Sequence, residues 1–132
     1  MSRPSIELFE PHEVGERSWG RELLIAHTDH YIGKLLFIKS GHAGGLQYHV
    51  EKDESFFLHT GAVRVDYDGG EGLVSFELEP GQTVHVPPGA PHRVTALEDS
   101  MLFEVSTPHF NDRVRCEADY GEPETGGLPT TR

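Results

Sequence analysis

The sequence predicts an all-β protein folded as a single domain, either an antiparallel barrel or a sandwich. At 132 residues the chain can close one hydrophobic core and is too short for two. From about Leu23 to Ser106 it alternates short apolar, β-branched or aromatic runs with clusters of Gly, Pro and Asp. No segment has the 3.6-residue apolar stripe of an amphipathic helix. Short strands at this spacing are typical of antiparallel barrels and sandwiches.

The predicted strands follow one another with only turns between them. In chain order, the runs that favour strands are LLIAHT, YIGKLLFIKSG, LQYHV, ESFFLHTGAVRVDYDGG, GLVSFELEPG, TVHVPPG, HRVTALED and MLFEVST. Gly69 and Gly70 predict a hairpin turn, because glycine adopts the positive φ angles that tight hairpins need. Large aromatic residues should fill the core, and we expect Trp19, Phe37 and Phe103 there.

The two ends of the chain differ from the predicted barrel, which we place at residues 18–118. Residues 1–17 are a polar lead-in, although Ile6 and Leu8 could add an edge strand or a subunit contact. Residues 119–132 are rich in Gly, Pro and Thr, so we expect a flexible tail. The chain therefore divides into a lead-in, a barrel and a tail.

Charge and cysteine content exclude several classes of function. Lys and Arg total 11 against 22 Asp and Glu, a formal net charge of −11 that repels nucleic acids and anionic membranes. The single Cys116 cannot form an internal disulfide, which fits a reducing compartment, and we expect the cytoplasm. No run of about 18 apolar residues and no apolar signal segment indicates membrane spanning or export. We expect a small-molecule ligand, with no nucleic acid or membrane partner.

Four side chains in two separate segments form a candidate metal site. On an extended strand, Gln47 and His49 emerge on the same face roughly 7 Å apart, and Glu54 follows five residues later. In the second segment, two prolines and Gly89 form a rigid turn that leads into a strand at His92. Two imidazoles, a carboxylate and an amide oxygen suit a borderline divalent cation. Gln47 is the weakest ligand of the four, and its amide could instead hydrogen-bond a bound water.

The same residues carry a resemblance to a known family. The spacing of Gly41, Gln47, His49, Glu54 and Gly61 resembles the first cupin motif, with Gln47 where the motif usually has its first His. The segment GQTVHVPPGAPHRV resembles the second cupin motif and supplies His92. The resemblance implies a cupin fold, a double-stranded β-helix or jelly-roll barrel. It also implies a homodimer and one divalent metal ion, Zn in the first place with Mn, Fe or Ni as alternatives, bound by Gln47, His49, Glu54 and His92.

A narrower resemblance concerns type II phosphomannose isomerases. The segment from Trp19 and Gly20 through Lys34 to Gln47 resembles the isomerase domain of those enzymes, and EVSTPHFNDRVR resembles its closing segment. This resemblance implies a lumen that binds a sugar or sugar phosphate, with Lys34 and Arg115 in phosphate-binding or proton-transfer roles. On the residues alone, Lys34 could equally cover the outer face of the barrel, and Arg115 could lie on a solvated surface.

Three functions remain open from the sequence. The first is a metal-dependent aldose–ketose isomerase resembling mannose-6-phosphate isomerase, in which a cation polarises the sugar while a base moves a proton. Candidates for that base are Glu104, Lys34 and a metal-bound hydroxide. The second is a non-haem Fe(II) dioxygenase, since two His and one carboxylate form the facial triad of such enzymes. The third is a non-catalytic module that binds a sugar or a metal.

Overall fold

The computed structural model describes residues 2–15 and 17–123, and these residues are almost entirely β-structure. The elements are β1 (His12–Glu13), β2 (Gly20–His27), β3 (Ile32–Ile38), β4 (Gln47–His49), β5 (Glu54–Thr60), β6 (Val63–Asp68), β7 (Leu73–Leu78), β8 (Thr83–Val86), β9 (His92–Ala96), β10 (Ser100–Ser106), β11 (Arg113–Arg115) and the 3₁₀-helix η1 (Glu117–Tyr120). The all-β prediction is confirmed. None of the described helices has the length and hydrophobicity to span a membrane.

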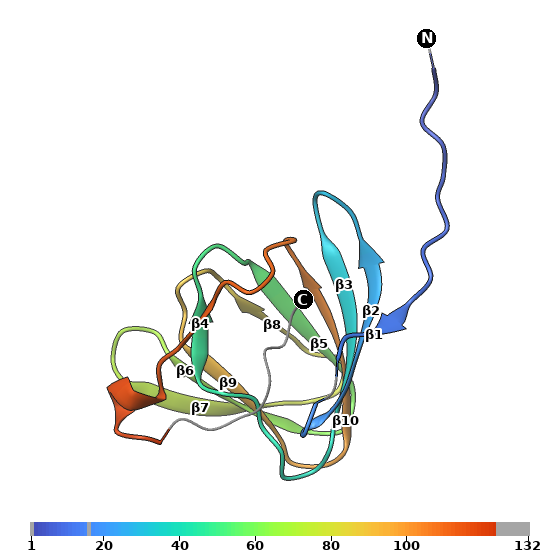
Figure 1. Cartoon of the computed structure of the whole chain (residues 1–132). Helices are drawn as coiled ribbons and strands as arrows, with labels where there is room; N and C mark the ends of the chain where they lie inside the picture. The colour runs from blue at the N-terminus through green and yellow to red at the C-terminus, as the bar shows by residue number, and fades with distance from the viewer. Residues whose placement is uncertain (1, 16, 124–132) are drawn as a thin grey trace.

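The strands form two antiparallel sheets that face each other and enclose a lumen (Figure 1). One sheet has the order β1-β2-β3-β10-β5-β8, and the other has the order β11-β4-β9-β6-β7. The chain crosses repeatedly from one sheet to the other, so residues distant in sequence line the same lumen. The predicted hairpin is present, because β6 pairs with β7 directly across the turn that holds Gly69 and Gly70.

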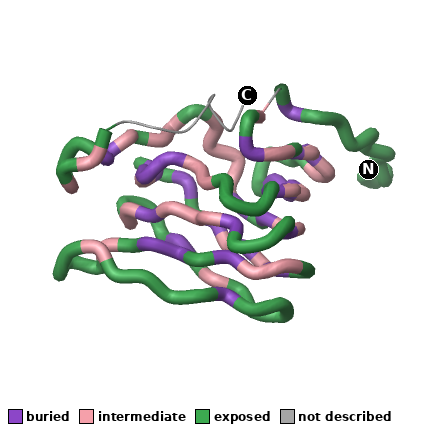
Figure 2. The backbone as a smooth tube through the Cα atoms, turned by 90° about the horizontal axis from the view of Figure 1, so that it is seen from below, coloured by how far each residue is buried: buried purple, intermediate pink, exposed green. Residues whose placement is uncertain are grey.

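Along most of the larger sheet, side chains alternate between the lumen and the outside, although a bulge interrupts β2 between Leu24 and Ala26. On β5, Glu54, Phe56 and Leu58 are buried while the residues between them are only partly buried. The main core packs between the sheets and consists of Trp19, Leu36, Ile38, Phe56, Leu58, Val63, Val65, Leu78, Val86, Ala96 and Leu102. In Figure 2 the buried residues lie along the strands, and the exposed residues lie mainly in the loops and the N-terminal segment.

Strand parity corrects the prediction for two aromatic residues. Trp19 is buried in the core, as expected. Phe37 and Phe103 are only half-buried, because their neighbours Leu36 and Leu102 occupy the inward positions of β3 and β10. Phe103 instead stacks against Phe57 on the outer face of the sheet, with ring centroids 6.2 Å apart. The outer face of this sheet is therefore partly aromatic.

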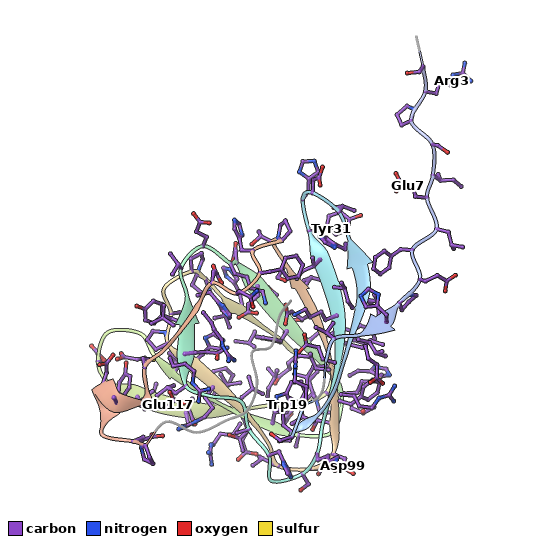
Figure 3. All side chains as sticks on the ribbon, in the orientation of Figure 1. Arg3, Glu7, Trp19, Tyr31, Asp99 and Glu117 are labelled. Atoms are coloured by element: carbon purple, nitrogen blue, oxygen red, sulfur yellow. The ribbon has the colours of Figure 1, made fainter. Side chains whose placement is uncertain are left out.

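A glycine lets the start of β2 lie close against the end of β3, where Gly20 pairs with Ile38. Gly20 has φ 153°, and a Cβ atom built on it would lie 1.7 Å from the carbonyl oxygen of Phe37. Only glycine fits this close approach of two backbones. Trp19, labelled in Figure 3, directly precedes this glycine and lines the lumen.

The two ends of the described chain leave the barrel in different ways. Residues 2–11, the N-terminal arm, extend away from the barrel before β1 pairs with β2 at the edge of the larger sheet (Figures 1 and 3). Ile6 and Leu8 on this arm are 99% and 88% exposed. At the other end, the 3₁₀-helix η1 follows the last strand and overlaps the first residues of the predicted tail, residues 119–132. Of that predicted tail, residues 124–132 lie outside the described part of the chain.

Candidate metal centre

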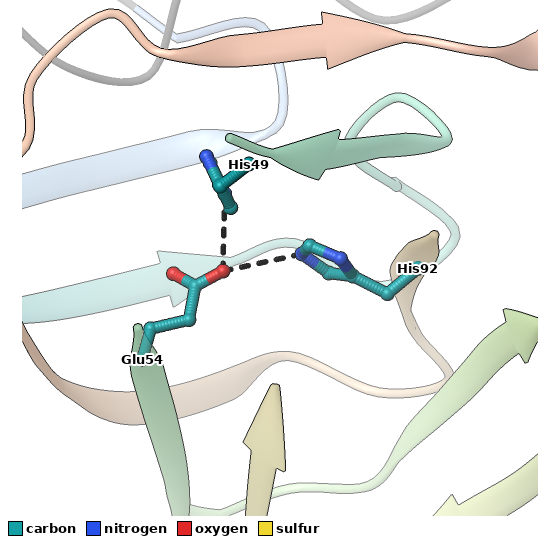
Figure 4. Close-up of side chains that lie close together, drawn as sticks. All are labelled: His49, Glu54 and His92. Atoms are coloured by element: carbon teal, nitrogen blue, oxygen red, sulfur yellow. Dashed lines mark ion pairs between the residues drawn. The ribbon is translucent and has the colours of Figure 1, made fainter. Parts of the chain in front are cut away.

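Three potential metal ligands converge in the lumen from three strands (Figure 4). His49 ends β4, Glu54 begins β5 and His92 begins β9, so both sheets contribute. Each residue is buried and offers one ligand atom, and the three atoms lie within 4.8 Å of one another. The imidazole rings of His49 and His92 are 5.6 Å apart between centroids, close enough to share one ion.

Both imidazoles point their Nε2 atoms at the same carboxylate oxygen. Oε2 of Glu54 lies 3.0 Å from Nε2 of His49 and 3.3 Å from Nε2 of His92. This buried oxygen has no hydrogen-bond partner among the described residues. Burial alone would raise the pKa of Glu54, but His49, His92 and Lys52 hold it well below its usual range, so the carboxylate is ionised.

The other ring nitrogen of each histidine faces a hydrogen-bond acceptor. Nδ1 of His92 lies 2.9 Å from the carbonyl oxygen of Ala90, which can only accept a hydrogen bond. Nδ1 of His49 lies 3.1 Å from Oδ1 of Asp112, whose pKa is also lowered. Both Nδ1 atoms therefore donate, and both Nε2 atoms point at Oε2 of Glu54. Two imidazole nitrogens and a carboxylate oxygen that face one point can share a cation, and this donor set fits a divalent metal.

A rigid turn places His92 as the sequence predicts. Gly89 has φ 85°, in the left-handed region that favours glycine. Its N–H donates to the carbonyl oxygen of His49 at 2.7 Å. The proline-rich turn thus ties the strand that carries one histidine directly to the other histidine.

Gln47 lies beside the three converging residues. It is buried, shares the inward face of β4 with His49 and pairs across the sheet with His92. Its Oε1 accepts a hydrogen bond from Nη1 of Arg113 at 3.4 Å. The amide oxygen therefore borders the site, and its role as a fourth ligand stays a prediction.

The cluster opens onto a cavity of about 80 Å³ with one apolar and one polar wall. Apolar side chains include Trp19, Leu36, Phe56 and Leu102, and the polar wall includes Gln47, Glu22, Lys52 and Glu104 together with the three converging residues. The apolar side chains lower the local dielectric constant and so strengthen electrostatic interactions inside the cavity. The site therefore suits a small polar ligand.

A lysine that no sequence motif indicated, Lys52, also lines this cavity. Lys52 is buried, and its Nζ lies 2.9 Å from Oε2 of Glu104 and 3.3 Å from Oε1 of Glu54. Burial alone would lower the pKa of Lys52, but the two carboxylates raise it above its ordinary value, so the amine is charged. Ser106 also donates to Glu104 at 2.9 Å. In the printed sequence Lys52 stands among charged residues like any exposed loop lysine, which is why the pattern gave no signal.

The two residues predicted for catalysis have carboxylate partners of their own. Lys34 faces the interior, which excludes the outer-face alternative, and its Nζ lies 2.8 Å from Oε2 of Glu22. Arg115 pairs with Glu117 at 2.7 Å. Within the described part of the chain, Glu22 lines the cavity while Lys34 and Arg115 stand behind its surface. Their catalytic roles stay predictions.

Comparisons with known proteins agree with this architecture. The family model described as "Cupin domain" matches residues 34–109, more than half of the chain. Among solved structures, KdgF from Halomonas sp. superposes with a TM-score of 0.65 at 22% identity, over 76% of this chain and 91% of that one. Oxalate decarboxylase from Bacillus subtilis superposes with a TM-score of 0.68 at 18% identity, over 86% of this chain and 35% of that one. Likeness at these identities shows the fold alone.

Two further similar proteins are longer than this chain. The capsular polysaccharide assembling protein CapF from Staphylococcus aureus superposes with a TM-score of 0.67 at 16% identity, over 82% of this chain and 34% of that one. The ribosomal protein uL16 3-hydroxylase of Escherichia coli (strain K12) is 38% identical over 63 residues. That match covers 46% of this chain and 17% of the hydroxylase, so the chain spans only a small part of this curated relative.

Proposed function

The chain belongs to the cupin domain family, and on that premise we propose that it is a metal-dependent enzyme that moves a proton between adjacent carbons of a sugar or sugar derivative. The specific reaction that we propose is the isomerisation of an aldose to a ketose. The narrower kinship with type II phosphomannose isomerases stays a prediction. The observation that carries the proposal is the buried Lys52–Glu104 pair beside the three converging ligands.

The proposed metal ligands are His49, Glu54 and His92, with Gln47 as the fourth. Nitrogen and carboxylate ligands suit zinc first, and Mn, Fe or Ni as alternatives. The ionised Oε2 of Glu54 and the two Nε2 atoms that point at it support this assignment. A bound divalent ion would polarise the carbonyl and hydroxyl oxygens of the substrate.

Glu104 and Lys52 would transfer the protons. As a carboxylate, Glu104 takes a proton from one substrate carbon and returns it to the neighbouring carbon. The Lys52 ammonium gives a proton to the carbonyl oxygen, which becomes a hydroxyl, and takes the proton of the neighbouring hydroxyl, which becomes the carbonyl. Both transfers return Glu104 and Lys52 to their starting forms, so the reaction needs no other reactant.

The charges around the cavity favour an unphosphorylated sugar. Glu54, Glu104 and Lys52 leave one net negative charge, which a divalent cation would convert to one net positive charge. This balance suits a neutral sugar or one with a single carboxylate better than a phosphate dianion. The predicted phosphate-binding roles of Lys34 and Arg115 would require both residues to leave Glu22 and Glu117.

A deuterium-exchange assay tests the proposed reaction. The zinc- or manganese-loaded protein is incubated in D₂O with hexoses, pentoses, hexuronates and mannose 6-phosphate, and proton NMR follows the C2–H signal. We expect deuterium incorporation and an isomeric product from one unphosphorylated sugar. Glu104→Gln should abolish the exchange and keep the metal, whereas Glu98→Gln in an exposed loop should behave as wild type. Exchange that persists in Glu104→Gln would remove Glu104 as the base.

The same set of sugars tests whether Lys34 and Arg115 bind phosphate. If they bind phosphate, Lys34→Met and Arg115→Met raise the KM for mannose 6-phosphate more than the KM for an unphosphorylated sugar. Equal changes in both KM values would limit the two residues to a structural role.

An Fe(II) oxygenase is the second candidate, favoured by two observations. His49, Glu54 and His92 are two histidines and one carboxylate, and the chain shares 38% identity with a hydroxylase over 63 residues. Iron in the purified protein, together with O₂ consumption in the presence of small organic substrates, would support this function over the isomerase. Sugar binding that survives His49→Ala and His92→Ala without any turnover would support a non-catalytic module.

The expected homodimer is also a proposal, and the N-terminal arm supports it. Ile6 and Leu8 are almost fully exposed, while Phe57 and Phe103 form an aromatic surface on the outer face of the larger sheet. We place the arm of one copy on this face of a second copy. Light scattering should give a dimer for the full chain and a monomer for Ile6→Asp/Leu8→Asp, and an unchanged dimer would exclude the arm as the contact.

A further inference from the structure

A single carboxylate closes the turn between β4 and β5 from a distant part of the chain. Asp112 lies just before β11, whose first residue, Arg113, pairs with His49 across the sheet. Oδ1 of Asp112 lies 3.1 Å from Nδ1 of His49. Oδ2 accepts hydrogen bonds at 2.8 Å from the backbone N–H groups of both Glu51 and Lys52.

The backbone of the same residue adds a fourth contact. The carbonyl oxygen of Asp112 accepts a hydrogen bond from the N–H of Val50 at 3.2 Å. Every residue from His49 to Lys52 is therefore held by Asp112. The side chain is only 16% exposed, so these contacts are largely shielded from solvent.

Two groups of the proposed site depend on this turn. His49 supplies a metal ligand, and the hydrogen bond to Asp112 fixes both the orientation of its ring and the nitrogen that carries the proton. Lys52 supplies the charged amine, which must reach back from the turn to Glu104 and Glu54. Because Asp112 contacts the ring of His49 and the backbone of Lys52, it holds the metal ligand and the charged amine in fixed positions relative to each other.

We infer that Asp112 is a positioning residue that sets the metal affinity of the site through His49 and the placement of the proton-transfer pair through Lys52. This inference rests on the metal site of the proposed function. It adds a residue that contacts neither the metal nor the substrate. In the sequence Asp112 stands among charged residues near Arg115, so nothing in the pattern distinguished this aspartate.

The test measures Co²⁺ binding to the full chain by visible absorption and by calorimetry. Removing the hydrogen-bond partner of a metal-binding histidine typically lowers affinity by about 10–100-fold, and we expect a loss in this range for Asp112→Ala. Asp112→Asn keeps one carbonyl oxygen as an acceptor and should recover part of the affinity. Asp53→Ala is the matched control, because Asp53 is a nearby half-exposed aspartate paired with His85 outside the cavity.

A second readout separates positioning from general stability. Nitrogen-15-edited NMR of the zinc-loaded chain reports the Nδ1–H proton of His49. Because this proton is hydrogen-bonded to Asp112, we expect it to exchange slowly with solvent in the wild type and in Asp53→Ala, and rapidly in Asp112→Ala. Asp112→Asn provides the same comparison if Asp112→Ala does not fold.

The outcomes separate this inference from the proposed function. Wild-type Co²⁺ affinity in folded Asp112→Ala, or an Nδ1–H of His49 that still exchanges slowly in that variant, would overturn the positioning role and leave the metal site intact. A wild-type chain that binds no Co²⁺, nor Zn²⁺ in competition, would overturn both.

Discussion

The two ends of the barrel lumen are built on the same three strands with opposite chemistry. On β3, β5 and β10, one end carries Lys34, Glu54 and Glu104, and the other carries Leu36, Leu58 and Leu102. We call these the charged end and the apolar end. The apolar end belongs to the main core, and its Leu36 and Leu102 also line the cavity. The charged end holds the candidate site, with Glu54 and Glu104 at the cavity surface and Lys34 behind it. A stable fold and a reactive site thus occupy successive positions of the same strands.

The difference shows how buried charges are tolerated in a small barrel. Burying a charge is expensive unless a partner of opposite charge is buried with it. At the charged end, Lys34 pairs with Glu22 and Lys52 pairs with Glu104. Glu54 pairs with Lys52 through one oxygen and faces two imidazoles with the other. The apolar end stabilises the fold enough to hold this oxygen where a cation can bind.

The largest expected effect is on metal binding at the charged end. Structural zinc sites contribute about 10–16 kcal/mol, so losing one of three ligands should cost at least about 3 kcal/mol, or more than about 100-fold in affinity. We expect Glu54→Gln to show this loss in a calorimetric zinc titration. Glu79→Gln, in an exposed loop, should bind as wild type. Equal affinity in Glu54→Gln would remove Glu54 from the ligand set.

Breaking a buried pair should destabilise the charged end strongly. Lys34→Met leaves Glu22 without its closest cation, although Arg17 still lies 3.2 Å from its other oxygen. We expect a loss of about 3 kcal/mol in the free energy of unfolding by urea, at the lower limit for a broken buried pair. Lys34→Met/Glu22→Leu should recover at least half of that loss. A single variant as stable as wild type would show that this pair does not hold the charged end.

At the apolar end, the expected loss comes from a cavity. Leu58 is fully buried, so Leu58→Ala should cost about 2–5 kcal/mol in the free energy of unfolding. Zinc affinity of the folded protein should stay within about twofold of wild type, because additive effects are expected for residues without shared partners. A large loss of zinc affinity in this variant would mean that the two ends are not independent.

The smallest effect concerns acid stability outside the lumen. Partial burial would raise the pKa of Asp66, but hydrogen bonds from Ser75 and Arg93 and the charge of Arg64 lower it. The stabilisation is therefore complete above the ordinary carboxyl pKa of about 3.9 and is lost as the pH falls further through the lowered value. Asp66→Asn should flatten this part of the curve of unfolding free energy against pH. An unchanged slope would assign the acid sensitivity to other carboxyl groups.

Much of the fold and part of the site were predictable from local patterns. Period-two alternation and turn residues predicted the strands. Motif spacing singled out His49, Glu54 and His92, the three residues that converge in the structure. Lys52 and Asp112 were not predictable, because each stands in a charged loop whose burial depends on contacts made far along the chain. The outward position of Phe103 was missed for a related reason, since hydrophobicity alone does not set strand parity.

The most direct test of the metal site is anomalous scattering from crystals of protein stripped with a chelator and then soaked in zinc. We predict one peak bonded to Nε2 of His49, Nε2 of His92 and an oxygen of Glu54, at the distances of about 2.0–2.2 Å typical of zinc. A peak at another site, or the absence of any peak in the lumen, would contradict the account.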